Sequence, residues 1–388
     1  MSQSHEGGRS IFSAPSTPHS EVSISAQSSA SLFALIHLTI DTTMPPPTAS
    51  QPSQAKGPPS SSQTAPKHPV QLSPEHHTIM LRHKLSPPTI HALTRLPRAP
   101  SPEEILRCAS SATEFRSFTF HPQEKGAFSR INNDPSTRWP VRETLAQPWQ
   151  KVYLVAQCEA AGRDYGDRLP LAARQDLLAT KPRIVKTLGH VLRACTDIMG
   201  ARKDAAGLRR TLELWRAVAA GSWEGMPTEL LQVPDIGPKK VEVLVEHGIR
   251  TVRQLAKLEF FHIERLLSRN PPFGQKIVRT LGHFPQLVLH LDIPKRDHER
   301  GLIVRVVLGC SNAEVPTWKG SVPLVNLAAE TTGGRLVFFW RGRAGGLMSA
   351  KELVFPVQET LPGQTIFVWA SCEEIAGTVV TAEKAIVI

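Results

Sequence analysis

The chain has 388 residues, enough for two or three domains of ordinary size. Lys and Arg outnumber Asp and Glu by 45 to 34, a net charge of +11 that is compatible with a nucleic-acid partner without requiring one. The five cysteines form no C-x-x-C pair, which argues against a zinc site or a disulfide framework and suits a reducing compartment: Cys108, Cys158, Cys195, Cys310 and Cys372.

Residues 1–75 are rich in serine and proline and poor in charged and large apolar residues. Such a segment cannot bury enough apolar surface to offset its ordering entropy, so it is predicted to be a disordered arm. The apolar stretch from Ser31 to Ile40 is too short to cross a bilayer, and it lies too far from the N-terminus to be a typical signal peptide. We therefore expect a soluble, intracellular protein with no membrane partner.

Residues 76–225 are predicted to form a helical bundle. The run Ser101-Pro102-Glu103-Glu104 is a strong helix start, because Ser suits the N-cap, Pro the first helical position and Glu the third. Later in this region, apolar residues keep helical spacing from 181 to 216, with a break near Gly200. The bundle is therefore expected to end with two long helices.

The same 181–216 stretch is strongly basic, with nine Lys and Arg residues against three acidic ones. One interpretation is a phosphate-facing stripe, for which Arg209 and Arg210 are the candidate nucleic-acid-binding residues. The other is the solvated face of an ordinary bundle helix. Composition alone leaves both interpretations open.

Residues 226–284 are predicted to contain a helix-hairpin-helix module. Pro238 suits the first position of a helix, and Gly248 suits the position just past its end. The run Thr251-Val252-Arg253-Gln254 has the form of a capping box and opens a further helix. A module of this kind grips a nucleic-acid backbone without reading its sequence.

The hairpin itself carries the candidate site. Gly237 lets the backbone approach a phosphate closely, because it has no Cβ and tolerates positive φ. Unsatisfied N–H groups and the helix dipole favour an anion at the start of the next helix, where Lys239 and Lys240 add charge. Together with Ile236 these are the candidate nucleic-acid-binding residues of the hairpin. Asp235 favours the alternative, an ordinary helical hairpin with solvated lysines, because a carboxylate repels phosphate.

From residue 285 to 388 the apolar period changes to two, which predicts a fibronectin-type-III-like antiparallel β-sandwich. Trp340 and Trp369 are predicted to be core residues of this sandwich rather than ligand-stacking ones. The whole chain is therefore predicted to be an α+β multidomain protein. Its expected strands are 287–291, 302–308, 335–340, 365–369 and 379–388.

A helical bundle, a helix-hairpin-helix and a sandwich in this order resemble the Sec-sixty-three homology domain, found behind the motor of certain Ski-two-like superfamily-two helicases. Glu124-Lys125, Ile131-Asn132 and Arg138-Trp139-Pro140 are similar to the motifs that open the family's domain. Pro234-Asp235-Ile236-Gly237-Pro238 is similar to the family's hairpin, with Asp235 as the departure. The segment 270–274 is similar to that of the meiotic crossover DNA helicase branch (the Mer-three type).

The resemblance implies a non-catalytic accessory region of a nuclear, meiotic DNA helicase, which grips unwound or branched DNA and assists strand separation in crossover recombination. It implies single-stranded or branched DNA, helicase motor domains and recombination proteins as partners. The chain contains no G-x-x-x-x-G-K-[ST] loop, so ATP and magnesium would belong to a 3'-5' motor absent from it. We expect no cofactor, metal site or catalytic residue here, whether the chain is a fragment of a helicase or a stand-alone accessory protein.

Two alternatives stay open. One is a protein-interaction scaffold of the same domain family without DNA binding, which Asp235 favours. The other is part of a spliceosomal-type RNA helicase. The translocon branch of the family is disfavoured, because the chain has no membrane span and no His-Pro-Asp motif.

Overall fold

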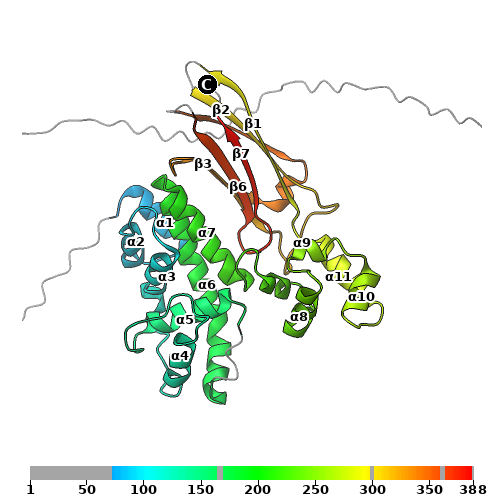
Figure 1. The fold of residues 1–388 in the computed structure, drawn as a ribbon. Helices are drawn as coiled ribbons and strands as arrows, with labels where there is room; N and C mark the ends of the chain where they lie inside the picture. Colours follow the sequence, from blue (N-terminus) through cyan, green and yellow to red (C-terminus); the bar gives the residue numbers. More distant parts are fainter. Residues whose placement is uncertain (1–71, 164–168, 298–300, 359–362, 387–388) are drawn as a thin grey trace, which may run out of the picture. The chain divides into compact units, whose positions relative to one another are not determined.

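The computed structural model describes residues 72–163, 169–297, 301–358 and 363–386. Helices occupy the first part of the described chain and two antiparallel sheets the last, which confirms the predicted α+β class (Figure 1). The predicted disordered arm, residues 1–75, lies outside the described residues except for 72–75, where Ser73 already caps a helix that begins at Pro74.

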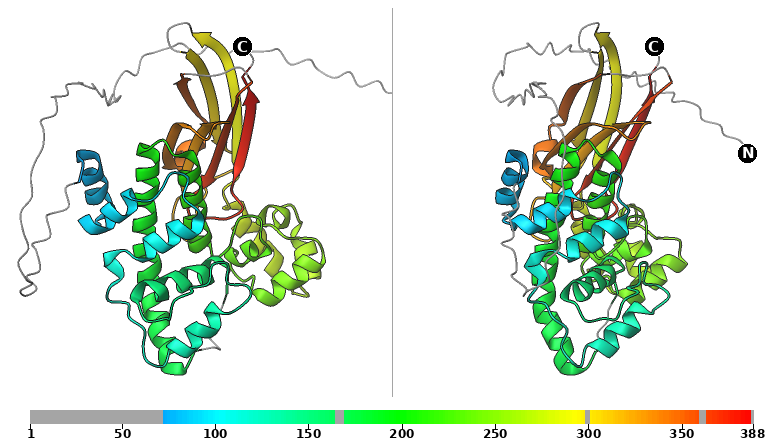
Figure 2. Two further views of the ribbon diagram at one scale, coloured as in Figure 1. Left: turned by 60° about the vertical axis from the view of Figure 1, so that its left-hand side comes forward. Right: turned by 90° about the vertical axis from the view of Figure 1, so that its left-hand side faces the viewer.

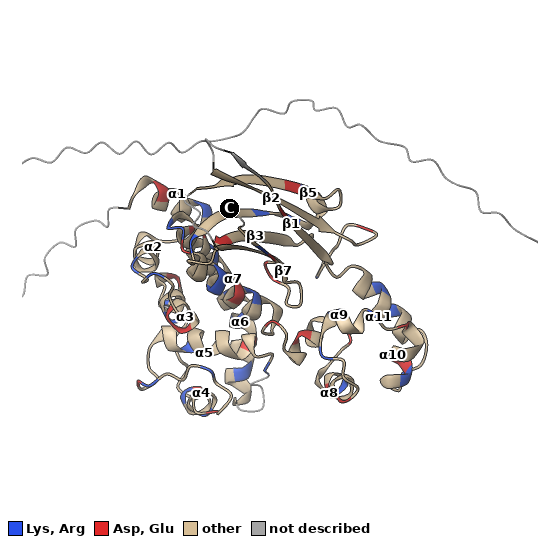
Figure 3. Cartoon of the chain, turned by 45° about the horizontal axis from the view of Figure 1, so that its top comes forward, with Lys and Arg blue, Asp and Glu red and all other residues tan. Residues whose placement is uncertain are grey.

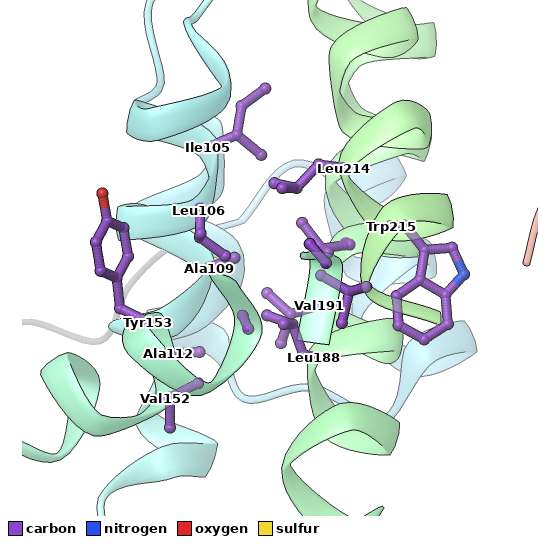
Figure 4. Close-up of a cluster of buried hydrophobic side chains, with 14 of the residues drawn as sticks. Ile105, Leu106, Ala109, Ala112, Val152, Tyr153, Leu188, Val191, Leu214 and Trp215 are labelled. Atoms are coloured by element: carbon purple, nitrogen blue, oxygen red, sulfur yellow. The ribbon is translucent and has the colours of Figure 1, made fainter. Parts of the chain in front are cut away.

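Apolar stripes on several helices meet to form the core of the helical part. Figure 4 shows Leu106 of α3, Leu188 and Val191 of α6 and Leu214 of α7 pointing toward one another. The helices of this part are α1 (Pro74–His83), α2 (Pro87–Thr94), α3 (Pro102–Ser110), η1 (Thr113–Phe115), α4 (Lys125–Asn132), α5 (Pro148–Ala160), α6 (Leu171–Ala201) and α7 (Ala205–Ala220).

Local capping signals place these helices where the sequence predicts them. Ser101 accepts the N–H of Glu104 at 3.2 Å, and the Glu104 carboxylate accepts the N–H of Ser101 at 2.7 Å, so the predicted capping box is confirmed. The predicted break near Gly200 is also confirmed, because α6 ends at Ala201. Asp204 then caps α7 by accepting the N–H of Gly207.

The motif residues that carry the family resemblance hold an irregular loop against the bundle. The Asn132 side chain exchanges two hydrogen bonds with the backbone of Val141, at 2.8 and 2.6 Å. The Gln157 side chain does the same with the backbone of Trp139, at 3.0 and 2.9 Å. The ring of Trp139 packs edge-on against that of Trp223, with centroids 5.9 Å apart. These residues therefore support the fold.

A buried ion pair joins α4 to α5. The Lys151 ammonium lies 2.7 Å from the Glu124 carboxylate, and both side chains are almost completely buried. Lys151 also donates to the Thr119 carbonyl, and Glu124 accepts the N–H of His121. These hydrogen bonds offset part of the cost of burying the two charges, while among the described residues the second carboxylate oxygen of Glu124 is buried without a hydrogen-bond partner.

Short helices follow the bundle. The predicted helix end is confirmed: Gly248 has φ +79°, and the N–H of Ile249 donates back to the Leu244 carbonyl at 2.8 Å. The predicted capping box of Thr251 and Gln254 is present as well. The helices of this part are η3 (Pro227–Gln232), α8 (Pro238–Glu246), α9 (Val252–Leu255), α10 (Phe260–Leu266) and α11 (Phe273–Gly282).

The strands form a three-stranded sheet in the order β1-β2-β5 and a four-stranded sheet in the order β4-β3-β6-β7. Figure 2 gives two further views of the sheets and the helices. All neighbours are antiparallel. The elements of this part are β1 (Leu287–Asp297), β2 (Gly301–Cys310), β3 (Leu324–Thr331), β4 (Leu336–Arg343), η4 (Ala344–Leu347), β5 (Lys351–Val357), β6 (Thr365–Cys372) and β7 (Val380–Ala385).

Two of these strands were not predicted. β3 is buried on both faces, so its burial does not alternate and the period of two is lost. β5 contains Pro356, which argues against a central strand; β5 is in fact an edge strand, where proline is tolerated. Trp369, predicted as a core residue of the sandwich, is buried against the helical part, whereas Trp340 is half-buried against the hydrophobic cluster of the two sheets.

The short helices share one hydrophobic cluster with the two sheets, which includes Leu244 of α8 and Val304 of β2. The loop between β6 and β7 forms hydrogen bonds with the segment that leads into the short helices. The Gln232 amide exchanges hydrogen bonds with the backbone of Ala376, at 3.3 and 3.1 Å, and Glu224 accepts the N–H of Gly377 at 3.0 Å. The segment just before the turn is therefore fixed to the β6–β7 loop by hydrogen bonds.

Candidate nucleic-acid interface

The candidate site is the turn of residues 233–237, between η3 and α8. Gly237 is the N-cap of α8 and is extended, with φ −97° and ψ 176°, so its tolerance of positive φ is not used in this turn. The left-handed residue is Asp235, with φ +66°. Aspartate is one of the few residues other than glycine that adopts this conformation readily. The departure from the family's hairpin is therefore compatible with the backbone.

The surface beside Gly237 is open. A Cβ placed on Gly237 would meet no atom within 4 Å. Within the described part of the chain, the N–H groups of Gly237 and Lys239 meet no acceptor, whereas that of Ile236 donates to the Val233 carbonyl at 3.1 Å. The Ile236 side chain is buried and anchors the turn from below. The N-terminus of α8 thus presents N–H groups to the outside.

The two lysines at the start of α8 differ in exposure and in contacts. Lys239 is exposed. Lys240 is half-buried; its ammonium donates to the Asp235 carbonyl at 2.5 Å and lies 4.7 Å from the centre of the Phe273 ring. Lys240 therefore braces the turn against α11, while Lys239 is the more accessible of the two.

Lys276 of α11 lies 2.7 Å from the Asp235 carboxylate. A hydrogen bond from Lys276, and then its positive charge, hold the pKa of Asp235 below its ordinary value. The carboxylate that would repel phosphate is therefore ionised but paired with a cation. Sequence reasoning missed Lys276: it lies in a predicted helix, but only the packing of α11 on the turn brings it to the site.

Arg209 and Arg210 lie on α7, and no contact in the described part of the chain links them to the turn. Arg209 forms an ion pair with Glu330 of β3 at 2.6 Å. Arg210 donates to the carbonyls of Ala99 and Pro100, at 2.6 and 3.1 Å. Both guanidinium groups thus already have internal acceptors.

Figure 3 marks the positions of Lys and Arg along α6 and α7 in blue and those of Asp and Glu in red. Other cations of the 181–216 stretch also have internal acceptors. Arg193 lies 3.2 Å from Glu373, and Arg216 lies 3.0 Å from Glu224. Arg202 donates to the Leu96 carbonyl at 2.9 Å. Much of this charge therefore ties α6 and α7 to their neighbours.

In the parts of the chain that the structure describes, no group of His, Cys, Asp and Glu is arranged to hold a metal ion, and no helix is long and apolar enough to cross a membrane.

The Sec63 Brl domain matches residues 75–379 of the chain. The chain is 24% identical to the ATP-dependent DNA helicase MER3 of Saccharomyces cerevisiae over 307 residues, which is 77% of this chain and 26% of that protein. It is 23% identical to the probable ATP-dependent DNA helicase HFM1 of Mus musculus over 211 residues, 53% of this chain and 14% of that protein. The ATP-dependent DNA helicase homolog MER3 of Arabidopsis thaliana is 20% identical over 255 residues, 63% of this chain and 22% of that protein.

The chain thus spans about a quarter or less of the curated relatives that it matches. The family match covers the bundle, the short helices and the strands β1 to β6, and ends just before β7. The chain belongs to the Sec63 Brl domain family.

Proposed function

We propose that this chain is a non-catalytic accessory region of a meiotic DNA helicase, and that it grips unwound or branched DNA through the turn before α8. The observation that carries the proposal is the open N-terminus of α8, where the accessible N–H groups of Gly237 and Lys239 lie beside Lys240 and Lys276. Helix N-termini bind anions through their free N–H groups and the helix dipole, and nearby lysines add attraction.

The finer structural assignments belong to this proposal. η3, the turn and α8 would form a helix-hairpin-helix, and the β1-β2-β5 and β4-β3-β6-β7 sheets a fibronectin-type-III-like sandwich. The domains would be the bundle at 76–225, the module at 226–284 and the sandwich at 285–388. Such a region would work in the nucleus beside helicase motor domains or recombination proteins, in crossover recombination.

The test is a fluorescence-anisotropy titration of the purified full chain with single-stranded and branched DNA at two salt concentrations. We expect affinity to fall steeply with salt, because phosphate binding releases counterions. Lys239→Glu/Lys240→Glu should weaken binding at least about tenfold at low salt, because the variant loses cations that contact phosphate. The salt dependence should also become shallower, since each lost phosphate contact reduces it. The control is Lys84→Glu/Lys319→Glu, which makes the same charge change at exposed lysines outside the module.

Equal losses in both double variants would remove the turn from the proposal.

A protein-interaction scaffold is the second candidate, favoured by the internal partners of Arg209 and Arg210. It predicts no DNA binding even at low salt and a partner complex that survives nuclease. Stronger binding to single-stranded RNA than to DNA would instead favour the spliceosomal type. We expect no ATP turnover by the chain alone.

A further inference from the structure

Two aromatic side chains are exposed side by side at the start of α10. Phe260 and Phe261 are 38% and 50% exposed, and their rings pack edge to face with centroids 5.6 Å apart. The Phe261 ring also lies 4.3 Å from the ring of His262. An aromatic ring that stays exposed does not gain the favourable free energy of burial. An exposed pair of rings therefore indicates a surface that binds something flat or apolar.

The pair is held rigidly on α11. A Cβ on Gly274 would lie 2.1 Å from the carbonyl oxygen of Phe260, so the two backbones are in direct contact. The buried carboxylate of Glu264 accepts the N–H of Gly274 at 2.8 Å and locks α10 onto the first turn of α11. Rings on a fixed backbone lose little conformational entropy on binding, because only two side-chain torsions remain to be ordered.

The same helix, α11, connects the pair to the candidate DNA site. Gly274 contacts Phe260, and Lys276 two residues later pairs with Asp235 of the turn. Exposed cations lie on both helices: Arg265 is one helical turn after Phe261 on α10, and Lys276 and Arg279 are one turn apart on α11. Aromatic rings beside a run of cations are the arrangement by which proteins bind single-stranded nucleic acid, with the cations on the phosphates and the rings on the bases.

We propose that Phe260 and Phe261 form a stacking platform for unpaired bases of a DNA strand whose backbone is held by the turn at 233–237. The inference rests on the proposed function and adds to it the form of DNA that is bound. Paired bases are stacked on their neighbours and offer no free face, so the platform selects single-stranded over duplex DNA. The exposed Arg265 on the same face as Phe261, and the cations of α11, favour a nucleic-acid strand over a neutral protein surface.

The test compares two single strands of equal length, a thymidine strand and an abasic strand with the same phosphates, in titrations of the full chain. The wild type should bind the thymidine strand about 5- to 100-fold more tightly, the effect of stacking one base. Phe260→Ala/Phe261→Ala should reduce thymidine-strand affinity to the abasic level and leave abasic-strand affinity unchanged. Leu81→Ala, which removes an exposed apolar side chain from α1, should change neither.

Phe261→Leu is a second variant, because leucine keeps an apolar side chain but has no ring face; it should lose most of the preference. Equal affinity of the wild type for both strands, or a preference that survives in the double variant, would overturn the platform and leave the proposed phosphate grip standing. Binding of neither strand would overturn the proposed function and the platform together. A double variant that keeps its strand preference but no longer binds a purified helicase motor would identify the pair as a protein-docking surface, which also overturns the proposal.

Discussion

Asp235 combines two properties that pull in opposite directions. Its backbone takes the left-handed step of the turn, with φ +66°, and its carboxylate places a negative charge beside the proposed phosphate site. Lys276 pairs with that carboxylate, which reduces the repulsion but also occupies a cation that could contact phosphate. The grip of the turn on DNA is therefore expected to be weaker than that of a hairpin with glycine at this position.

Asp235→Gly tests this balance. Glycine accepts the left-handed backbone without strain, and the substitution removes the carboxylate and releases Lys276. We expect DNA affinity at low salt to rise several-fold and the salt dependence to steepen by about one phosphate contact. The comparison variant is Asp235→Ala, which should gain similar affinity but melt at a lower temperature, because alanine is strained at positive φ. Unchanged affinity in both variants would place the phosphate elsewhere.

At the scale of elements, the packing of α10 on α11 depends on one glycine. The carbonyl of Phe260 occupies the space that a side chain at Gly274 would need, so the two helices can approach this closely only with glycine there. Gly282, at the other end of α11, has open space where its Cβ would be. The same substitution at Gly274 and at Gly282 therefore compares a crowded position with an open one on the same helix.

Gly274→Ala should cost about 1–3 kcal/mol in the free energy of unfolding, because a backbone oxygen cannot yield without moving α10. It should also lower the preference for a base-bearing strand, since the Phe pair moves with α10. Gly282→Ala should stay within about 0.5 kcal/mol of the wild type. Urea denaturation of the three proteins measures this, and equal stability of the two variants would contradict the close approach of the helices.

On the scale of the whole molecule, Asp197 of α6 links the helical part to the four-stranded sheet. Its carboxylate lies 2.8 Å from His83 and 2.9 Å from Arg82 of α1, and 3.2 Å from Arg341 of β4. Burial by itself would raise the pKa of Asp197, but the hydrogen bond from His83 and the charge of Arg341 outweigh it and hold the pKa below its ordinary value. The ionised carboxylate is therefore a stabilising link between the two parts.

Asp197→Asn should lower the free energy of unfolding by about 3 kcal/mol at pH 7, because His83 and Arg341 lose their buried partner. A carboxyl whose pKa is lower in the folded state stabilises the protein above its unfolded pKa of about 3.9, and this contribution disappears as the pH falls through the folded pKa. The difference between variant and wild type should therefore shrink below about pH 4. Urea unfolding at several pH values measures it, with the exposed Glu246→Gln as control. A difference that stays constant down to pH 3 would exclude the ionised link.

Signals that depend on a few neighbouring residues were readable from the sequence. The capping box at Ser101 and the helix between Pro238 and Gly248 follow from backbone preferences and caps that act within one or two turns. β3 escaped prediction because burial on both faces removes its alternation, and β5 because Pro356 is tolerated only at an edge.

The sequence by itself determined that helices precede strands, the family and the place of the turn, because each depends on local conformation or on motifs read along the chain. Only the tertiary structure decided which charges remain available. It pairs Asp235 with Lys276, gives Arg209 and Arg210 internal partners and leaves Phe260 and Phe261 exposed. The physical reason is that pairing and exposure depend on residues distant in the chain, which meet only when helices and sheets pack.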